Sequence, residues 1–535
     1  MRKYLSMGAA LVLAVSVAAC GSNKGASTAS HSEEGSSKPY PELRWGTYAF
    51  GSKLELRKEL GEATAMIEGE AVQGLEAVEP DGKLKPALAS SIEQPNSTTY
   101  VYHLKPGVKF SDGKPLTIAD VLYSLKLDLG NESAVKGFWE DVSSVSPQGS
   151  SAVVIKLKRP NTLWPEYLSL SDQIVEKEAA EQRGGEKTLG TNTNLPVGTG
   201  PWKFDSFTPE VGVKLSRNPY WAGTRQGPER LDYIVFKTEA SEGLALRSGA
   251  IDGASGYSSP KQFLNIPGAR ELTAPGVALT FLEMNTSTKP FDNVHVRRAI
   301  GYAVNVQGML KALFPPGYAS EQTTFAARSL FAHLGSAAEV NAMLASLPKY
   351  AFDLAAAKRE LAKSPYPRGF STTLQVGTGE PEQLGAAEIV ISDLTKIGIM
   401  VKIHEFSASE YPDLFTGKFE IWLQNYQNIY PDPEAMFSLL LSPSQINPPG
   451  SGLNGSRYRN DEVSKLLLTQ REALDPKQRL QEIGKLLKIA GEDEPYAVLF
   501  TPDDALALSD KYVFPSFSPW ISLYGPIGMG VKLAK

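Results

Sequence analysis

The chain has 535 residues, of which 42% are hydrophobic and 21% are charged, and its formal net charge is −5. One hydrophobic core rarely serves so long a chain, so we expect about two to four domains of a soluble globular protein. A negative net charge without a long run of Lys and Arg argues against nucleic acid as a partner.

Residues 1–20 have the pattern of a secretory signal peptide. Basic residues precede the apolar run Ala9–Ala19, which is shorter than the roughly 20 residues that a membrane span needs. The residues Val17–Cys20 resemble a bacterial lipobox, in which the cysteine becomes the acylated first residue of the mature protein. Acyl chains contribute ~0.8 kcal/mol per buried methylene, so lipidation of Cys20 would hold the protein to a membrane. The alternative is a secretory signal that ends in cysteine by chance.

A linker rich in Gly and Ser follows the signal peptide. Residues 21–38 lack the apolar side chains that a core requires, and we expect them to form a flexible tether. Folded sequence begins near Pro39. Because Cys20 is the one cysteine of the chain, no intramolecular disulfide can form, and stability must come from the buried core.

Strand and helix patterns mix along the folded part of the chain without a fixed repeat. Thr117 with Asp120 three residues later resembles a capping box, which predicts that a helix begins there. The apolar patterns predict strands at 43–49, 99–104 and 152–157 and a helix at 59–75. We therefore expect an α/β fold with mixed sheets.

Five segments have distinctive patterns that recur together in one family. They are LKPGVKFSDGKPLTIADVLYSLKL (104–127), PVGTGPWKF (196–204), LSRNPYWAG (215–223), LRSGAIDGA (246–254) and FLEMNTSTKPFDNVHVRRAIGYAVN (281–305). In this order they resemble the extracytoplasmic solute-binding proteins of peptide-type ABC importers, family 5, over nearly the whole mature chain. Members of this family are commonly tethered lipoproteins, which suits the lipobox.

These segments identify a fold and not a ligand. In PVGTGPWKF, Gly198 and Gly200 permit backbone geometry that is barred to other residues. The segment lacks the lysine and the following helix of a P-loop, so it is interpreted as a crossing between domains and not as a phosphate site.

The resemblance implies a two-lobed, periplasmic-binding-protein-like fold with a hinge and an extra subdomain inserted in the first lobe. Closure of the lobes about the hinge would bury a ligand between them. The expected parts are lobe I (39–73, 197–274 and 497–535), the inserted subdomain (74–196) and lobe II (275–496).

No catalytic or metal-binding motif occurs in the sequence. No two of the five histidines are three or four residues apart, and the single cysteine is assigned to the lipid, so no zinc pattern exists. EF-hand spacing, a G-x-S-x-G elbow and a Walker motif are also missing. We expect no catalytic activity, no cofactor and no metal. The alternative is a pair of acidic residues that acts as in a glycosidase.

The segment FEIWLQNYQNIYPDP, residues 419–433, is the best candidate for a ligand-binding loop, because a strand pattern changes there into aromatic and amide residues. In peptide-binding members of the family, an aromatic residue is followed three positions later by an aspartate that binds the peptide's α-ammonium. Tyr426 matches the aromatic position and Ile429 matches the aspartate position. An isoleucine cannot balance a buried ammonium, and leaving a buried charge unpaired costs ~3–5 kcal/mol.

Three explanations of Ile429 remain open. The ligand has no free ammonium at this place, as in a blocked or cyclic peptide, a sugar or another uncharged solute. Alternatively, another carboxylate binds the ammonium, and Glu62 and Asp432 are the candidates. In the third explanation, the alignment of this loop is shifted.

The loop composition favours a neutral site of aromatic and amide side chains. In the inserted subdomain, members of the family can place an aromatic residue over the ligand, and packing in the subdomain core is the alternative for such a residue. The predicted ligand-binding residues are Tyr426, Gln427, Asn428, Ile429, Tyr430, Glu62, Phe138 and Trp139.

The resemblance implies a receptor that captures a peptide or a peptide-sized polar solute outside the cytoplasmic membrane. We expect it to act as a monomer in the periplasm or cell envelope and to deliver the solute to ABC permease subunits. The alternatives are a non-peptide solute such as an oligosaccharide, and a receptor that reports ligand occupancy to a signalling partner without import.

Overall fold

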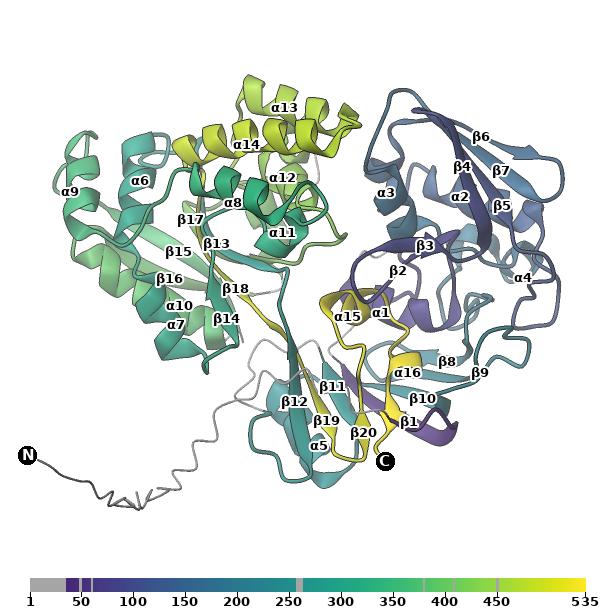
Figure 1. Cartoon of the computed structure of the whole chain (residues 1–535). Coiled ribbons are helices and arrows are strands. Elements are labelled where there is room, and N and C mark those ends of the chain that lie inside the picture. The colour runs from purple at the N-terminus through teal and green to yellow at the C-terminus, as the bar shows by residue number, and fades with distance from the viewer. Residues whose placement is uncertain are drawn as a thin grey trace, which may run out of the picture. The chain divides into compact units, whose positions relative to one another are not determined.

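The computed structural model describes residues 35–47, 51–58, 61–255, 263–378, 381–407, 409–448 and 452–535. The chain divides into two compact units, Met1–His31 and Ser32–Lys535, and the described residues belong to the second (Figure 1). The predicted signal peptide with Cys20 and most of the predicted tether lie outside the described residues. Within the described ranges, no helix has both the length and the apolar character that crossing a membrane requires.

A mixed sheet of seven strands is formed within the described residues, in the order β12-β19-β11-β1-β10-β9-β8. The strands are β1 (Tyr40–Thr47), β8 (Trp202–Thr208), β9 (Gly212–Arg217), β10 (Pro228–Val235), β11 (Gly253–Ser255), β12 (Ala269–Ala274) and β19 (Asp504–Ser509). β1 runs parallel to β10 and to β11, with Trp45 opposite Tyr233 and Gly253. Helix α1 (Glu62–Ala71) packs on this sheet through Met66 and Ile67, which are buried in the same cluster.

A second mixed sheet has the strand order β14-β18-β13-β17-β15-β16 in the described part of the chain. Its strands are β13 (Leu279–Met284), β14 (Ala319–Glu321), β15 (Ser371–Gly377), β16 (Met400–Phe406), β17 (Ile421–Tyr426) and β18 (Tyr496–Pro502). Adjacent residues of β13 enter different apolar clusters, Phe281 on one face and Leu282 on the other, so the strand is buried on both faces.

Helices cover the two faces of this second sheet. The cluster around Leu282 includes side chains of α6 (Val294–Ala303), α7 (Val306–Leu313), α9 (Leu354–Ala362) and α10 (Pro381–Thr395). The cluster around Phe281 includes side chains of α8 (Ala337–Ala345), α12 (Glu434–Leu441), α13 (Asp461–Glu472) and α14 (Pro476–Asp493).

An antiparallel sheet of β4 (Ala89–Asn96), β5 (Thr99–Leu104), β7 (Ala152–Leu157) and β6 (Val142–Gln148) forms the core of the segment that was expected as the inserted subdomain. It packs with α2 (Ile118–Asp128), α3 (Trp164–Ser171) and the short helix η1 (Lys136–Trp139). The predicted capping box is confirmed, because the Asp120 carboxylate accepts a 2.9 Å hydrogen bond from the Thr117 backbone N–H at the start of α2.

The remaining elements are short. They are β2 (Glu76–Val78), β3 (Leu84–Pro86), α4 (Lys177–Gln182), η2 (Gly185–Lys187), α5 (Glu239–Ser248), η4 (Arg328–Phe331), α11 (Tyr411–Phe415), η5 (Pro443–Gln445), β20 (Tyr512–Val513), α15 (Pro519–Tyr524), α16 (Ile527–Gly530) and β21 (Lys532–Leu533).

The α/β class with mixed sheets is confirmed, and the chain crosses between the two mixed sheets at two places. It passes from β12 to β13 after Ala274 and from β18 to β19 after Pro502. The second crossing differs from the expected lobe boundary at residue 497, because β18 hydrogen-bonds to β13 and belongs to the six-stranded sheet throughout. In the expected division, the strand would have been assigned to lobe I.

Two glycines of the PVGTGPWKF segment lie against the carboxyl end of α1. Neither Gly198 nor Gly200 has a positive φ, so the expected special backbone geometry is wrong. Space is the reason for glycine here: a Cβ on Gly198 would lie 2.2 Å from the carbonyl oxygen of Ala71, and a Cβ on Gly200 would lie 2.6 Å from its carbonyl carbon. The glycines therefore let this segment pack directly on the helix.

We predict that Gly198→Ala destabilises the protein by roughly 1–3 kcal/mol, because the added methyl overpacks a backbone contact. The matched control is Gly137→Ala, since a Cβ there would meet no atom within 4 Å and the residue has no positive φ. Urea denaturation and thermal melting of both variants measure the effect. Equal midpoints for the two variants would contradict the close-packing explanation.

Candidate functional site

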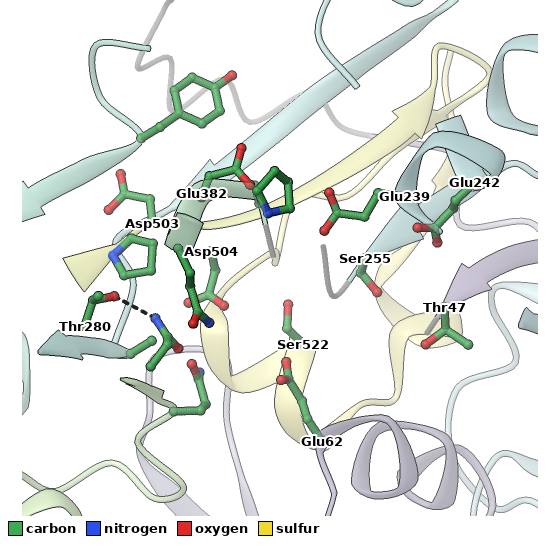
Figure 2. Close-up of a pocket in the computed structure, with 18 of the residues that line it drawn as sticks. Thr47, Glu62, Glu239, Glu242, Ser255, Thr280, Glu382, Asp503, Asp504 and Ser522 are labelled. Atoms are coloured by element: carbon green, nitrogen blue, oxygen red, sulfur yellow. Dashed lines mark hydrogen bonds between the residues drawn. The ribbon is translucent and has the colours of Figure 1, made fainter. Parts of the chain in front are cut away.

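A cavity of about 730 Å³ lies where residues of the two mixed sheets meet (Figure 2). On the side of the seven-stranded sheet, it is lined by Thr47 at the end of β1, Phe236 just after β10, and Ser255 at the end of β11. These three strands are parallel, so their carboxyl ends meet at one edge of the sheet. Ligands of open α/β sheets bind in the crevice outside such carboxyl ends.

Two helices bring carboxyl groups to the same edge. Glu62 is the first residue of α1, and Glu239 and Glu242 lie in the first turn of α5. Thr238 caps α5, because its hydroxyl oxygen accepts a 3.2 Å hydrogen bond from the Ser241 backbone N–H. Negative charge is favourable in the first turn of a helix, so the local fold tolerates these acids. In Figure 2, Glu62, Glu239 and Glu242 lie around one space between α1 and α5.

The six-stranded sheet supplies the opposite lining. Thr280 of β13 and Asn425 of β17 lie on neighbouring antiparallel strands, and the Asn425 side-chain amide donates a 2.8 Å hydrogen bond to the Thr280 hydroxyl. Gln427, directly after β17, also lines the cavity. The crossing from β18 to β19 completes the lining with Asp503 and Asp504.

The lining is strongly acidic. Among the described lining residues, one is basic, Lys237, and its side chain is exposed. The acidic residues of the lining are Glu62, Glu239, Glu242, Glu382, Asp503 and Asp504. The composition of the 419–433 loop favoured a neutral site, whereas the cavity lining is acidic. The carboxyls of the lining come from segments that lie far from this loop along the chain.

Burial changes the proton affinity of two of these acids. Burial raises the pKa of Glu242 to about 8, and the nearby Glu239 carboxylate adds to the shift. Burial also raises the pKa of Asp504 well above its usual range, with further contributions from Glu62 and then Asp503. Both shifts have the same cause, a carboxyl removed from water with no cation among the described residues close enough to lower its pKa.

The structure separates the predicted ligand-binding residues into two groups. Glu62 and Gln427 line the cavity. Tyr426 does not: its ring packs edge-on against Phe281, with 5.4 Å between ring centroids, beside the cluster around Phe281. Asn428 is completely buried, and its side-chain amide donates a 3.2 Å hydrogen bond to the Asp432 carbonyl oxygen.

Ile429 and Tyr430 belong to a small apolar cluster that joins the 419–433 loop to α3. We call this the loop cluster; its members are Leu163, Tyr167, Leu170, Tyr430 and Ala435, with Phe138, Ile429 and Tyr524 packed against them. The Tyr524 hydroxyl donates a hydrogen bond to the Ile429 carbonyl oxygen. Ile429, which matched the family aspartate, is therefore packed against side chains from three other segments of the chain.

The two predicted subdomain aromatics have different surroundings. Phe138 is half-buried in the loop cluster, with its ring centroid 6.3 Å from that of Tyr430. Trp139 is buried in the subdomain core, where its indole N–H donates a 2.8 Å hydrogen bond to the Ser171 hydroxyl. Neither residue lines the cavity.

Asp432, one of the alternative ammonium-binding candidates, is already paired inside the protein. Its carboxylate accepts hydrogen bonds of 2.6 and 2.7 Å from the Arg479 guanidinium and one of 2.9 Å from His333. Burial opposes ionisation of this fully buried group, but Arg479 and His333 outweigh it and hold the pKa of Asp432 well below its usual range. The acid is engaged in the protein, and Glu62 is the candidate that lies on the cavity.

The acids at positions 239, 242, 382, 503 and 504 were missed by the sequence analysis. The pair Asp503-Asp504 follows directly on the strand pattern YAVLFTP, and acids at a strand end are a weak signal for a site. The signal becomes strong only when α1, α5 and this crossing are brought to one sheet edge, which requires the tertiary fold.

We predict that Ile429→Asp destabilises the protein by roughly 2–4 kcal/mol, because it places a charge among apolar side chains. The matched control is Val211→Asp, since Val211 is 63% exposed in a turn. Thermal melting and urea denaturation compare the two. Similar melting of both variants would show that Ile429 has no packing role.

Known proteins resemble this chain over most of its length. The model of the bacterial extracellular solute-binding proteins, family 5 (middle), matches residues 83–448. The oligopeptide-binding protein AppA of Bacillus subtilis is 24% identical over 551 aligned positions, covering 96% of each chain. The glutathione-binding protein GsiB of Salmonella typhimurium is 25% identical, covering 80% of this chain and 82% of its own.

A solved structure shares the fold of this chain. The periplasmic binding protein DppA of Helicobacter pylori, in complex with the peptide STSA, superimposes with a TM-score of 0.78 and 24% identity, covering 92% of this chain and 98% of its own. This likeness confirms the predicted two-lobed fold class. With the family model matching most of the chain, the protein belongs to the bacterial extracellular solute-binding proteins of family 5, which serve ABC importers.

Proposed function

We propose that this protein is an extracytoplasmic receptor that captures a peptide or peptide-sized polar solute and delivers it to an ABC permease without chemical change. The observation that carries the proposal is the cavity at the carboxyl ends of β1, β10 and β11, whose lining continues onto β13 and β17. A solute held there contacts both mixed sheets at once. The volume of the cavity, about 730 Å³, falls in the roughly 300–1,000 Å³ range of small-molecule sites.

The relatives favour a peptide-like solute. Their names describe binding of oligopeptides by AppA and of glutathione by GsiB, and DppA was solved with the peptide STSA. The polar lining agrees with such a ligand, because Asn425, Gln427 and Thr280 offer amide and hydroxyl groups that can pair with peptide groups.

We further propose that the mature protein is tethered to a membrane through an acyl group on Cys20 and acts as a monomer. The support is the lipobox pattern at Val17–Cys20 and the Gly/Ser-rich tether that follows it. Two or more acyl chains bind a bilayer stably, whereas a single chain binds reversibly.

Thermal melting tests the solute class. A ligand that binds only the folded protein stabilises it by about 2.7 kcal/mol at one hundred times its Kd, so the matching solute raises Tm with increasing concentration. We expect this rise with a pool of di- to pentapeptides and none with a pool of oligosaccharides. The reverse pattern would identify a non-peptide receptor.

The cavity itself is tested by Asn425→Trp, which places an indole on an exposed lining residue and should abolish the peptide-dependent rise in Tm. The matched control is Thr208→Trp, which adds the same bulk to an exposed strand residue outside the lining. An unchanged response in Asn425→Trp would place the solute elsewhere.

Cell fractionation tests the tether. Wild-type protein should sediment with membranes and incorporate labelled palmitate, and Cys20→Ser should lose the label and leave the membrane fraction. The control Ser22→Ala keeps the acyl acceptor and should behave as wild type. Membrane association of Cys20→Ser equal to that of wild type would contradict lipid anchoring.

A further inference from the structure

One oxygen of each of two carboxyls and one hydroxyl oxygen in the cavity lining are buried without a hydrogen-bond partner in the described part of the chain. Among the residues that the structure describes, Glu242 Oε1, Asp504 Oδ2 and Thr47 Oγ1 are buried atoms for which no donor is present. Glu242 is only 4% exposed and Thr47 is fully buried, and both line the cavity. Buried polar atoms are almost always hydrogen-bonded in folded proteins, so three exceptions that line one cavity require an explanation.

Other buried acids of this chain do have donors. Glu70 accepts a 2.7 Å hydrogen bond from the Tyr233 hydroxyl, and Glu283 accepts a 2.8 Å bond from the Ser456 backbone N–H. Asp432 is held by Arg479, as described above. Glu70 and Glu283 each keep a second oxygen without a donor, but one oxygen of each is satisfied. In contrast, no donor to either carboxyl oxygen of Glu242 or Asp504 is present among the described residues.

The Glu242 side chain lies between α5 and the end of β1. Its Oε1 atom would lie 2.5 Å from a Cβ on Gly46, so its carboxyl reaches the end of β1 beside Thr47. The glycine leaves room for the carboxyl at the cavity wall. In Figure 2, Glu242 and Thr47 lie together on one side of the cavity, and Glu62 and Glu239 lie nearer its centre.

The negative charge of an ionised carboxyl indicates which kind of hydrogen-bond donor would suit these cavity acids. A carboxylate in a poorly solvated site is stabilised by a cation that also donates hydrogen bonds, and leaving it alone costs free energy. Among the described lining residues, the one basic side chain is the exposed Lys237. A cationic occupant would let these acids ionise, whereas a neutral or acidic occupant would favour their protonated forms.

We propose that the solute places a cationic nitrogen group, an ammonium or a guanidinium, in this acidic cavity, with Glu242 or Asp504 as its principal anionic contact. This inference rests on the proposed function, because it takes the cavity to be the solute site. It also gives Ile429 a consistent meaning: the positive group of the solute is bound by lobe I or the β18–β19 crossing instead of the 419–433 loop. The group comes either from the α-amine of a peptide or from a basic side chain.

Isothermal titration with a matched panel of tripeptides tests the inference and distinguishes the two sources. The panel is acetyl-Ala-Arg-Ala-amide, acetyl-Ala-Gln-Ala-amide, acetyl-Ala-Glu-Ala-amide, Ala-Ala-Ala-amide with a free amine, and acetyl-Ala-Ala-Ala-amide. We expect at least one cationic member to bind about tenfold or more tightly than its neutral partner, a difference of about 1.4 kcal/mol. A preference for the Arg peptide identifies a side-chain cation, and a preference for the free amine identifies the α-ammonium.

Equal binding of cationic and neutral peptides, or tighter binding of the Glu peptide, would overturn the inference and leave the peptide-receptor function standing. If no peptide of the panel or of the di- to pentapeptide pool binds to the folded protein, the proposed function fails as well. The two failures are therefore distinct.

Isosteric variants locate the charge. Glu242→Gln and Asp504→Asn keep side-chain size but cannot become anionic. At least one of them should weaken the preferred cationic peptide about tenfold while changing its neutral partner by less than about twofold. The matched control is Asp510→Asn, since Asp510 is exposed in the turn after β19 and outside the lining. Unchanged affinity in both cavity variants, with melting curves like wild type, would overturn the assignment.

Discussion

The candidate site depends on one constraint: the chain must cross between two mixed sheets, and it does so beside the carboxyl ends of three parallel strands. Ala278 lies on the β12–β13 crossing and Asp503 and Asp504 lie on the β18–β19 crossing, and all three line the cavity. Because β1 pairs in parallel with β10 and β11, the loops that leave these strands open at the same place. The crossing and the sheet edge together make a site to which both sheets contribute.

The loop cluster fills the part of the 419–433 loop in which peptide-binding members of the family have a ligand-binding aspartate. At the position matched to a ligand-binding aspartate, Ile429 packs with Tyr430, Tyr167 and Phe138. The Tyr430 hydroxyl donates a 2.5 Å hydrogen bond to the Glu434 carboxylate, which forms an ion pair with Arg471. The loop cluster is therefore filled by apolar contacts and lies beside the Glu434–Arg471 ion pair, and the acids of the cavity lining lie outside it.

The sequence was sufficient for the fold class and for several individual elements. The strands predicted at 99–104 and 152–157 are β5 and β7, and the capping box at Thr117 begins α2. Local patterns of this kind are set by neighbouring residues, so one sequence can reveal them. The reason for Gly198 was not visible, because the atom it avoids belongs to Ala71, more than a hundred positions earlier.

The site was predicted less well, for the same physical reason. Glu62 was predicted from its place in a family pattern and Gln427 from the amide-rich composition of its loop. The acidity of the cavity arises only when α1, α5 and the β18–β19 crossing meet. Native mass spectrometry of the protein as purified, with fragmentation of any released ligand, tests the central claim most directly. The account predicts a peptide-sized molecule with a basic nitrogen group, and a bound solute that is neutral or acidic would contradict it.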